Sequence, residues 1–210
     1  MTHHRFLAAL YDRMTGPAEK AGLRKMRAEL LAEASGRTLE LGAGTGLNLS
    51  HYSPKVTELV LAEPDRFMAQ RLRKRVASEP PPAASVEVVE ARAEDLPFDA
   101  ESFDTVVGTL VLCTVEHPGS ALNEVARVLK PGGRYLFLEH VRSESPRLAR
   151  WQDRLERPWG WMGGGCHPNR ATAETLHGSQ LEVERLDTDR FPKAPPLVRP
   201  LIRGAATRPA

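Results

Sequence analysis

The stretch LELGAGTGLN, residues 39–48, decides the fold of this chain. A short apolar run leads into three alternating glycines, Gly42, Gly44 and Gly46, and then into the start of a helical pattern. Glycine adopts positive φ readily and lets a ligand approach the backbone. Ligands of open α/β sheets bind at the carboxyl ends of the strands. The stretch therefore predicts a cofactor site after the first strand of such a sheet.

The spacing of the glycines narrows the kind of cofactor. G-x-G-x-G differs from the G-x-G-x-x-G that binds a pyrophosphate, and no Lys-Ser or Lys-Thr follows to make a triphosphate loop. Glu63 ends the second expected strand, 19 residues after Gly44, where a carboxylate can accept hydrogen bonds from a ribose diol. These features favour S-adenosylmethionine, which has a ribose and no diphosphate, over a dinucleotide.

Short apolar runs alternate with helical patterns along most of the chain, which predicts a mostly parallel sheet with helices on both faces. The seven expected strands are 38–42, 58–63, 86–91, 103–112, 134–140, 181–187 and 197–207. Helical spacing covers 5–34, with a break at Thr-Gly-Pro, and also 65–78 and 120–130. Residues 79–85 and 130–133 are expected loops, and the chain after residue 145 is expected to be irregular up to the sixth strand.

Composition limits the class of protein further. The 210 residues suit one α/β domain, and 29 basic against 27 acidic residues, a net charge of +2, argue against a nucleic-acid partner. The two cysteines make no disulfide framework and lack metal-ligand spacing, so we expect no metal. No segment approaches the roughly 18 apolar residues of a membrane span. We therefore expect a cytoplasmic protein without integral membrane association.

Three further motifs follow in order: ARAEDLPF (91–98), LVLCTVEHPG (110–119) and LNEVARVLKPGGRYLFLE (122–139). Together with the glycine loop and Glu63, they resemble class I S-adenosylmethionine-dependent methyltransferases, in the subgroup that contains the menaquinone and ubiquinone C-methylating enzymes. The resemblance covers at least residues 37–140. It implies an α/β, Rossmann-like fold with an N-terminal helical cap, S-adenosyl-L-methionine as cofactor and S-adenosyl-L-homocysteine as product.

The resemblance also implies a cofactor site. The glycines and Asn48 would line the methionine part, Glu63 would hold the ribose, and Ala93 and Glu94 would meet the adenine. Many relatives have Asp where this chain has Arg92, which leaves Glu94 to replace the usual acceptor for the adenine amino group. The full expected set is Tyr11 in the cap, Gly42, Gly44, Gly46, Asn48, Glu63, Ala93, Glu94 and Thr109.

Beyond residue 140 a narrower resemblance begins. Together with residues 109–141, the stretches GGGCHPNR (163–170) and LVRPLIRGAA (197–206) are similar to the animal thiol S-methyltransferases of the methyltransferase-like seven group and their bacterial relatives. Those animal enzymes begin with a hydrophobic membrane-associating segment that is not found here, so membrane attachment is not expected. The chain then divides into a cap (1–36), a cofactor-binding core (37–140), a substrate lid (141–180) and terminal strands (181–210).

A thiol acceptor needs little help from the protein. With a pKa of about 8.5 it is partly ionised at neutral pH, so a modest base or a positive field suffices. His140, at the end of the fifth expected strand, is the candidate catalytic residue, although it could instead cap that strand. Methyl transfer from a sulfonium needs no covalent enzyme intermediate, so Cys166 is interpreted as structural and Cys113 as a small buried residue.

Acceptor chemistry depends on the lid rather than on the fold, so alternatives stay open. Three tryptophans in the lid could form an apolar pocket wall or simply pack on the sheet: Trp151, Trp159 and Trp161. We expect a methyltransferase acting on a small-molecule thiol. O-, N- or C-methylation of a quinone, lipid or secondary metabolite is the alternative, and a catalytically silent module that binds S-adenosylmethionine is the remote one.

Overall fold

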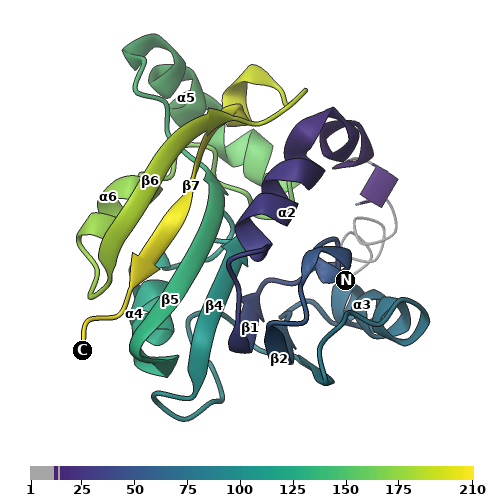
Figure 1. The fold of residues 1–210 in the computed structure, drawn as a ribbon. Helices are drawn as coiled ribbons and strands as arrows, with labels where there is room; N and C mark the ends of the chain where they lie inside the picture. The colour runs from purple at the N-terminus through teal and green to yellow at the C-terminus, as the bar shows by residue number, and fades with distance from the viewer. Residues whose placement is uncertain (1–11, 14) are drawn as a thin grey trace.

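The computed structural model describes residues 12–13 and 15–210, and its centre is one seven-stranded sheet (Figure 1). The strand order is β3-β2-β1-β4-β5-β7-β6, in which β7 is antiparallel to both of its neighbours and the other pairings are parallel. This confirms the expected α/β class and the mostly parallel sheet. The strands are β1 Gly36–Leu41, β2 Val56–Ala62, β3 Ser85–Val89, β4 Phe103–Thr109, β5 Leu129–His140, β6 Glu182–Arg190 and β7 Pro200–Thr207.

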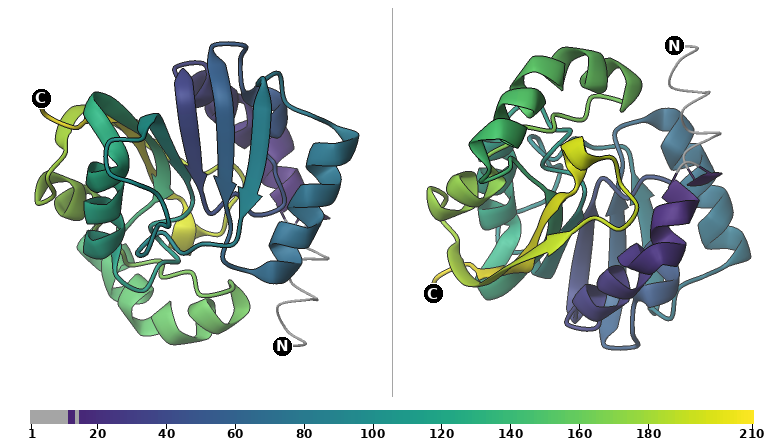
Figure 2. Two further views of the ribbon diagram at one scale, coloured as in Figure 1. Left: turned by 90° about the horizontal axis from the view of Figure 1, so that it is seen from below. Right: turned by 90° about the horizontal axis from the view of Figure 1, so that it is seen from above.

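Helices cover both faces of the sheet (Figure 2). Strand residues alternate between the two faces, and each face has its own core. Val106 packs with α4 and α6, whereas its neighbour Val107 packs with α2 and α3. The helical elements are η1 Glu19–Leu23, α2 Arg24–Leu31, η2 Leu49–His51, α3 Arg66–Ser78, α4 Pro118–Val128, α5 Pro146–Met162, α6 Thr172–His177 and η3 Pro196–Val198.

Local chemistry explains where α3 begins. Asp65 precedes it in an extended conformation, and its carboxylate accepts hydrogen bonds from the backbone N–H groups of Phe67 and Met68 at 2.8 and 3.0 Å. These are N–H groups that a helix leaves without internal partners, and an Asp N-cap satisfies them. The Asp65 N-cap therefore fixes the start of α3 just after Glu63, at the end of β2.

Two expectations about the backbone were wrong. Residues 130–133 belong to β5 rather than to a loop, because Gly132 donates to the Arg208 carbonyl and Arg208 donates back to Gly133, both at 2.9 Å. The chain after residue 145 is not irregular, since α5 spans Pro146–Met162. Proline suits the first turn of a helix, and the buried Gln152 anchors α5 from within.

The N-terminal cap is described only in part. Its described elements are η1 and α2, which join at a kink where Gly22 has φ of 139°. Tyr11 lies outside the described residues, so its expected place over the cofactor stays a prediction. Within the described part of the chain, none of the helices has the length and apolar character needed to cross a membrane.

Candidate active site

The glycine loop follows β1 and bends tightly against its neighbours. Gly42 and Gly44 have φ of 55° and 58°, a region that residues with side chains rarely occupy. A Cβ on Gly42 would lie 2.8 Å from Cγ2 of Val111, so the loop packs directly on the segment after β4. A Cβ on Gly44 would approach no described atom closer than 3.9 Å. At Gly44 the missing side chain therefore leaves open space for a ligand.

Glu63 meets this loop from the end of β2. One carboxylate oxygen accepts a 2.8 Å hydrogen bond from the Gly44 N–H, and the other accepts a 2.9 Å bond from the Asp65 N–H. Burial raises the pKa of Glu63, and the two backbone donors oppose that shift. The structure thus brings together Gly44 and Glu63, the two features that predicted the cofactor.

Asn48 and Thr109 belong to a buried polar network beneath the loop. The Arg27 guanidinium donates to the side-chain oxygen Oδ1 of Asn48 at 3.0 Å and to the Thr109 hydroxyl at 2.8 Å. The Asn48 amide donates to Thr109 at 3.0 Å and to Glu40 at 2.9 Å. The Tyr52 hydroxyl donates to the second Glu40 oxygen at 2.7 Å. Arg27 and Glu40 both belong to this network, and the sequence interpretation did not include either of them among the expected site residues.

A small cleft opens where the loop and the network meet. It contains Gly42, Gly44, Asn48 and Thr109 from the expected set. Its described lining is Arg27, Glu40, Gly42, Ala43, Gly44, Thr45, Leu47, Asn48 and Thr109. Gly46 lies beside the cleft, where a Cβ would contact the side chains of Leu49 and Leu72 within 3 Å.

Ala93 and Glu94 follow β3 and are not among the described residues that line the cleft. Ala93 is buried. The Glu94 carboxylate accepts hydrogen bonds from the backbone N–H groups of Glu116 and His117, at 2.9 and 3.4 Å, where α4 begins. Arg92 forms ion pairs with Glu116 at 2.9 Å and with Glu94 at 3.6 Å. Glu94 thus holds the segment that leads into α4, and its expected contact with adenine stays a prediction.

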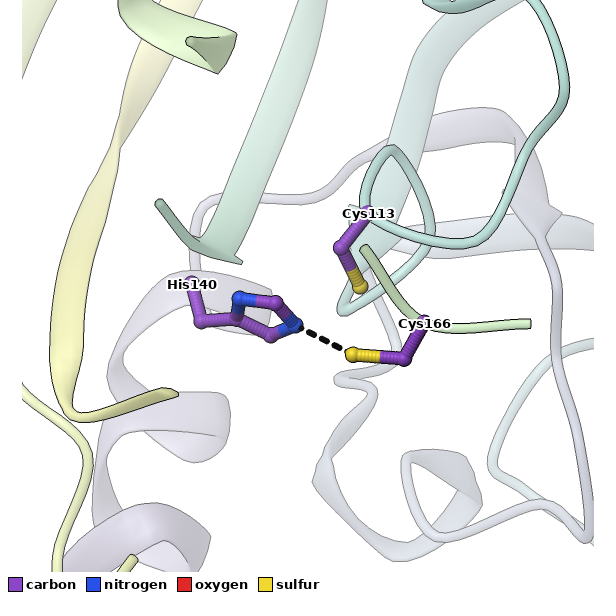
Figure 3. Close-up of side chains that lie close together, drawn as sticks. All are labelled: Cys113, His140 and Cys166. Atoms are coloured by element: carbon purple, nitrogen blue, oxygen red, sulfur yellow. Dashed lines mark hydrogen bonds between the residues drawn. The ribbon is translucent and has the colours of Figure 1, made fainter. Parts of the chain in front are cut away.

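His140, at the carboxyl end of β5, faces two cysteines (Figure 3). Its Nε2 lies 2.9 Å from Sγ of Cys166, and Nε2 and the sulfurs of Cys113 and Cys166 all lie within 4.8 Å of one another. The indole N–H of Trp159 donates to Cys166 at 3.2 Å. The Cys113 thiol, and after it His140 and Trp159, lowers the pKa of Cys166 against the opposing effect of burial. Cys166 is therefore part of a polar cluster, which its interpretation as structural did not predict.

Glu139 holds the turn that carries Cys113. Its Oε1 accepts hydrogen bonds from the backbone N–H groups of Val111 and Leu112, at 2.9 and 3.1 Å. His140 is 3% exposed, and its Nδ1 has no hydrogen-bond partner among the described residues. Two adjacent residues of β5 thus build the cluster: His140 is one of its members, and Glu139 holds the turn that carries Cys113.

Neither interpretation of the tryptophans fits all three. Trp151 and Trp161 are 50% and 75% exposed, so they neither pack on the sheet nor form the wall of a buried pocket. Trp159 alone is half-buried, through its contact with Cys166. The neighbouring His167 is turned toward Glu156, whose carboxylate oxygen lies 2.6 Å from its Nδ1.

Comparison with known proteins identifies the class that this fold and cleft define. Residues 39–137 match the family described as methyltransferase domain. A SAM-dependent methyltransferase from Thermotoga maritima, 22% identical, has the same fold with a TM-score of 0.70, and the match covers 97% of each chain. The protein is an S-adenosylmethionine-dependent methyltransferase with a Rossmann-like class I fold.

Two relatives show to which methyltransferase family the chain belongs. The chain is 37% identical to thiol S-methyltransferase TMT1B of Rattus norvegicus over 174 residues, which are 81% of this chain and 70% of that one. It is 31% identical to a phosphatidylethanolamine N-methyltransferase of Cereibacter sphaeroides over 178 residues, 83% of this chain and 84% of the relative. The chain belongs to the methyltransferase family that contains these enzymes.

Proposed function

We propose that the protein methylates the sulfur of a small-molecule thiol. The similarity to thiol S-methyltransferase TMT1B carries this proposal, because its 37% identity over 81% of the chain exceeds the 31% identity to the N-methyltransferase relative. The cofactor-binding core, residues 37–140, is shorter than the 174 matched residues. The similarity must therefore include parts of the cap, lid or terminal strands, where acceptors are selected.

The residues of the loop and the cleft offer polar groups that suit the cofactor. Gly44 leaves the backbone accessible for the methionine part, and Glu63 retains carboxylate lone pairs for the ribose hydroxyls. Arg27 adds a buried cation that can pair with the methionine carboxylate. The proposed cofactor set is Arg27, Gly42, Gly44, Gly46, Asn48, Glu63, Ala93, Glu94 and Thr109, with Tyr11 from the cap.

When bound, S-adenosylmethionine supplies a methyl group that a sulfonium activates toward in-line displacement. The chain must orient the acceptor, exclude water and favour the acceptor's ionised form. His140 is the residue to which we assign that last task, since it lies at the end of β5, beside the strand that carries Thr109. A thiol ionises far more readily than an alcohol, so a buried imidazole environment is enough.

Release of S-adenosylhomocysteine tests the proposal. Purified protein is offered an alkyl thiol, a dithiol, a catechol, a quinol and an amine, each against a reaction without acceptor. Turnover confined to the thiols, with a rate that rises with pH as the thiol ionises, is the expected result. Turnover on the amine alone would overturn the thiol assignment in favour of the chemistry named in the N-methyltransferase relative. Turnover on the catechol or quinol alone would overturn it in favour of O- or C-methylation.

A further inference from the structure

We propose that Cys113, His140 and Cys166 bind one zinc ion and leave a fourth coordination position for the acceptor thiol. The metal site is inferred from the geometry of the cluster, and only the identity of the fourth ligand rests on the proposed function. The inference replaces the expectation of no metal that the sequence spacing favoured.

The three side chains form a known type of zinc ligand set. Two thiolates and one imidazole, with one position left to solvent or substrate, is an arrangement that catalytic zinc sites use. Around a tetrahedral zinc the ligand atoms lie about 3.5–3.8 Å apart, given Zn–S and Zn–N lengths of about 2.3 and 2.0 Å. The three ligand atoms here all lie within 4.8 Å of one another, and Nε2 of His140 lies 2.9 Å from Sγ of Cys166, so the observed distances bracket that separation. Side-chain rotations that move the ligand atoms by about an ångström or less would bring them to the distances of a tetrahedral zinc site.

Independent backbone contacts hold the two cysteines in position. The turn of Cys113 is fixed through Glu139, the neighbour of His140 on β5. The loop of Cys166 is tied to the same turn, because the His167 N–H donates to the Cys113 carbonyl at 2.7 Å. The Trp159 indole N–H donates to the Cys166 sulfur, the kind of outer contact that orients metal ligands. A pre-positioned set costs little to organise when an ion binds.

The cluster lies next to the cofactor cleft. Cys113 follows β4 by four residues, and Thr109 at the end of β4 lines the cleft. Val111, between them, packs against Gly42 of the glycine loop. Cys113 and His140 are 2% and 3% exposed, whereas Cys166 is half-buried, so access is from the side of Cys166. An acceptor entering there would meet the metal close to the methyl donor.

Coordination would give the acceptor its reactive form. A thiol bound to zinc loses its proton to solvent. The sulfur of the bound thiolate then uses one lone pair to form a bond to the methyl carbon. The carbon–sulfonium bond breaks, and its electron pair remains on the sulfur of S-adenosylhomocysteine. The thioether product is a weak zinc ligand and dissociates, with no change in oxidation state.

Metal content tests the site without reference to activity. The 210-residue protein, prepared under reducing conditions without a histidine tag and dialysed, is expected to retain about one zinc per chain. Cys166→Ser and Cys113→Ser should retain roughly tenfold less, or lower still. His167→Gln is the matched control, because His167 adjoins Cys166 but pairs with Glu156, and its zinc content should equal that of the wild type. Wild-type protein without zinc, or with Cys113 and Cys166 joined in a disulfide, would overturn the inference.

Cobalt substitution tests the fourth position in the wild-type protein, so no variant has to fold. Cobalt in this site should show thiolate charge-transfer absorption and the intense visible bands of a tetrahedral ion. An alkyl thiol added without S-adenosylmethionine should increase the charge-transfer band, and the matching alcohol should not. An unchanged spectrum would overturn the acceptor position. Metal binding without thiol turnover would refute the proposed function alone. Thiol turnover by zinc-free protein would refute the role of the metal in binding the acceptor and leave the proposed function intact.

Discussion

The backbone N–H of Gly44 donates a 2.8 Å hydrogen bond to the carboxylate of Glu63 and thereby ties the loop after β1 to the end of β2. The same carboxylate accepts from the Asp65 N–H on its other oxygen. A carboxylate offers about four lone-pair positions, so both oxygens retain capacity for a diol. The protein thus orients Glu63 before any ligand arrives.

The substitution Glu63→Gln should weaken the binding of S-adenosylhomocysteine by roughly tenfold or more. A hydrogen bond to a charged group contributes about 1.5–3 kcal/mol, and the amide removes the charge while preserving an acceptor for Gly44. Titration calorimetry measures the change in Kd. Glu58→Gln, at the opposite end of β2 and exposed, should leave Kd unaltered. Equal affinities for wild type and Glu63→Gln would remove Glu63 from the cofactor site.

Replacing Gly44→Ala should weaken cofactor binding and cost about 1–2 kcal/mol of stability. The stability cost comes from its φ of 58°, and the binding cost from a methyl group in open space beside the cleft. Calorimetry and denaturant unfolding separate the two effects. Gly119→Ala is the control: it lies in α4 with no atom within 4 Å of the added Cβ and should gain about 0.5 kcal/mol. Undiminished cofactor affinity in Gly44→Ala would place the ligand elsewhere.

Local signals predicted the sheet, the glycine loop and Glu63, because strand periodicity, glycine spacing and strand ends are visible within short windows of sequence. Arg27 could not be found in this way. Its partners Asn48 and Thr109 are 21 and 82 residues away, and the contact arises only when the fold brings Arg27 of α2 to the loop after β1 and to the end of β4. An arginine in an expected helix is usually a surface residue, and burial distinguishes this one.

The cysteine cluster was missed for a related reason. Metal-ligand patterns in a sequence depend on ligands from one short segment, whereas His140 is 27 residues from Cys113 and 26 from Cys166. Helix α5 was hidden by its composition, since Pro146, Pro158 and the following glycines are typical of loops. Only tertiary contacts show that Pro146 begins a helix and that the three glycines at 163–165 bring the chain back, so that Cys166 lies beside His140 of β5.

Glu40 should make stability depend on pH. Burial raises its pKa from 4.5 to about 7, so the folded protein binds this proton more tightly than the unfolded chain. The contribution is complete below about pH 4.5 and is lost as the pH rises through about 7. Between about pH 5 and pH 8 the free energy of unfolding should fall about 2.5 kcal/mol further in the wild type than in Glu40→Gln.

Denaturant unfolding at the two pH values measures this difference between wild type and variant, so titrations shared by both proteins cancel. Glu87→Gln, exposed on β3, should follow the wild type. If Glu40→Gln also follows the wild type, Glu40 is ionised in the folded state. The hydrogen bonds from Tyr52 and Asn48, together with the Arg27 guanidinium, then outweigh the effect of burial on its pKa.

Gln152→Leu should loosen the lid from the sheet. The Gln152 side chain is fully buried in α5, where its amide donates to the carbonyls of Val141 and Leu197 at 3.1 and 2.9 Å and its oxygen accepts from Ser143 at 2.8 Å. Leucine has a similar size but leaves these three backbone groups unpaired, at about 1–3 kcal/mol for each buried group. Hydrogen exchange should rise across residues 146–162, and the free energy of unfolding should fall by about 3 kcal/mol or more.

Arg150→Ala on the exposed face of the same helix tests whether any change in α5 has this effect, and it should shift stability by less than about 0.5 kcal/mol. A local effect of Gln152→Leu would also reach Trp159, about two turns further along α5, and through its indole the sulfur of Cys166. The Trp159 fluorescence should therefore shift in Gln152→Leu and stay constant in Arg150→Ala, measured with Trp151 and Trp161 replaced by Phe. Unchanged exchange in α5 would mean that its other contacts, and not Gln152, hold the lid on the sheet.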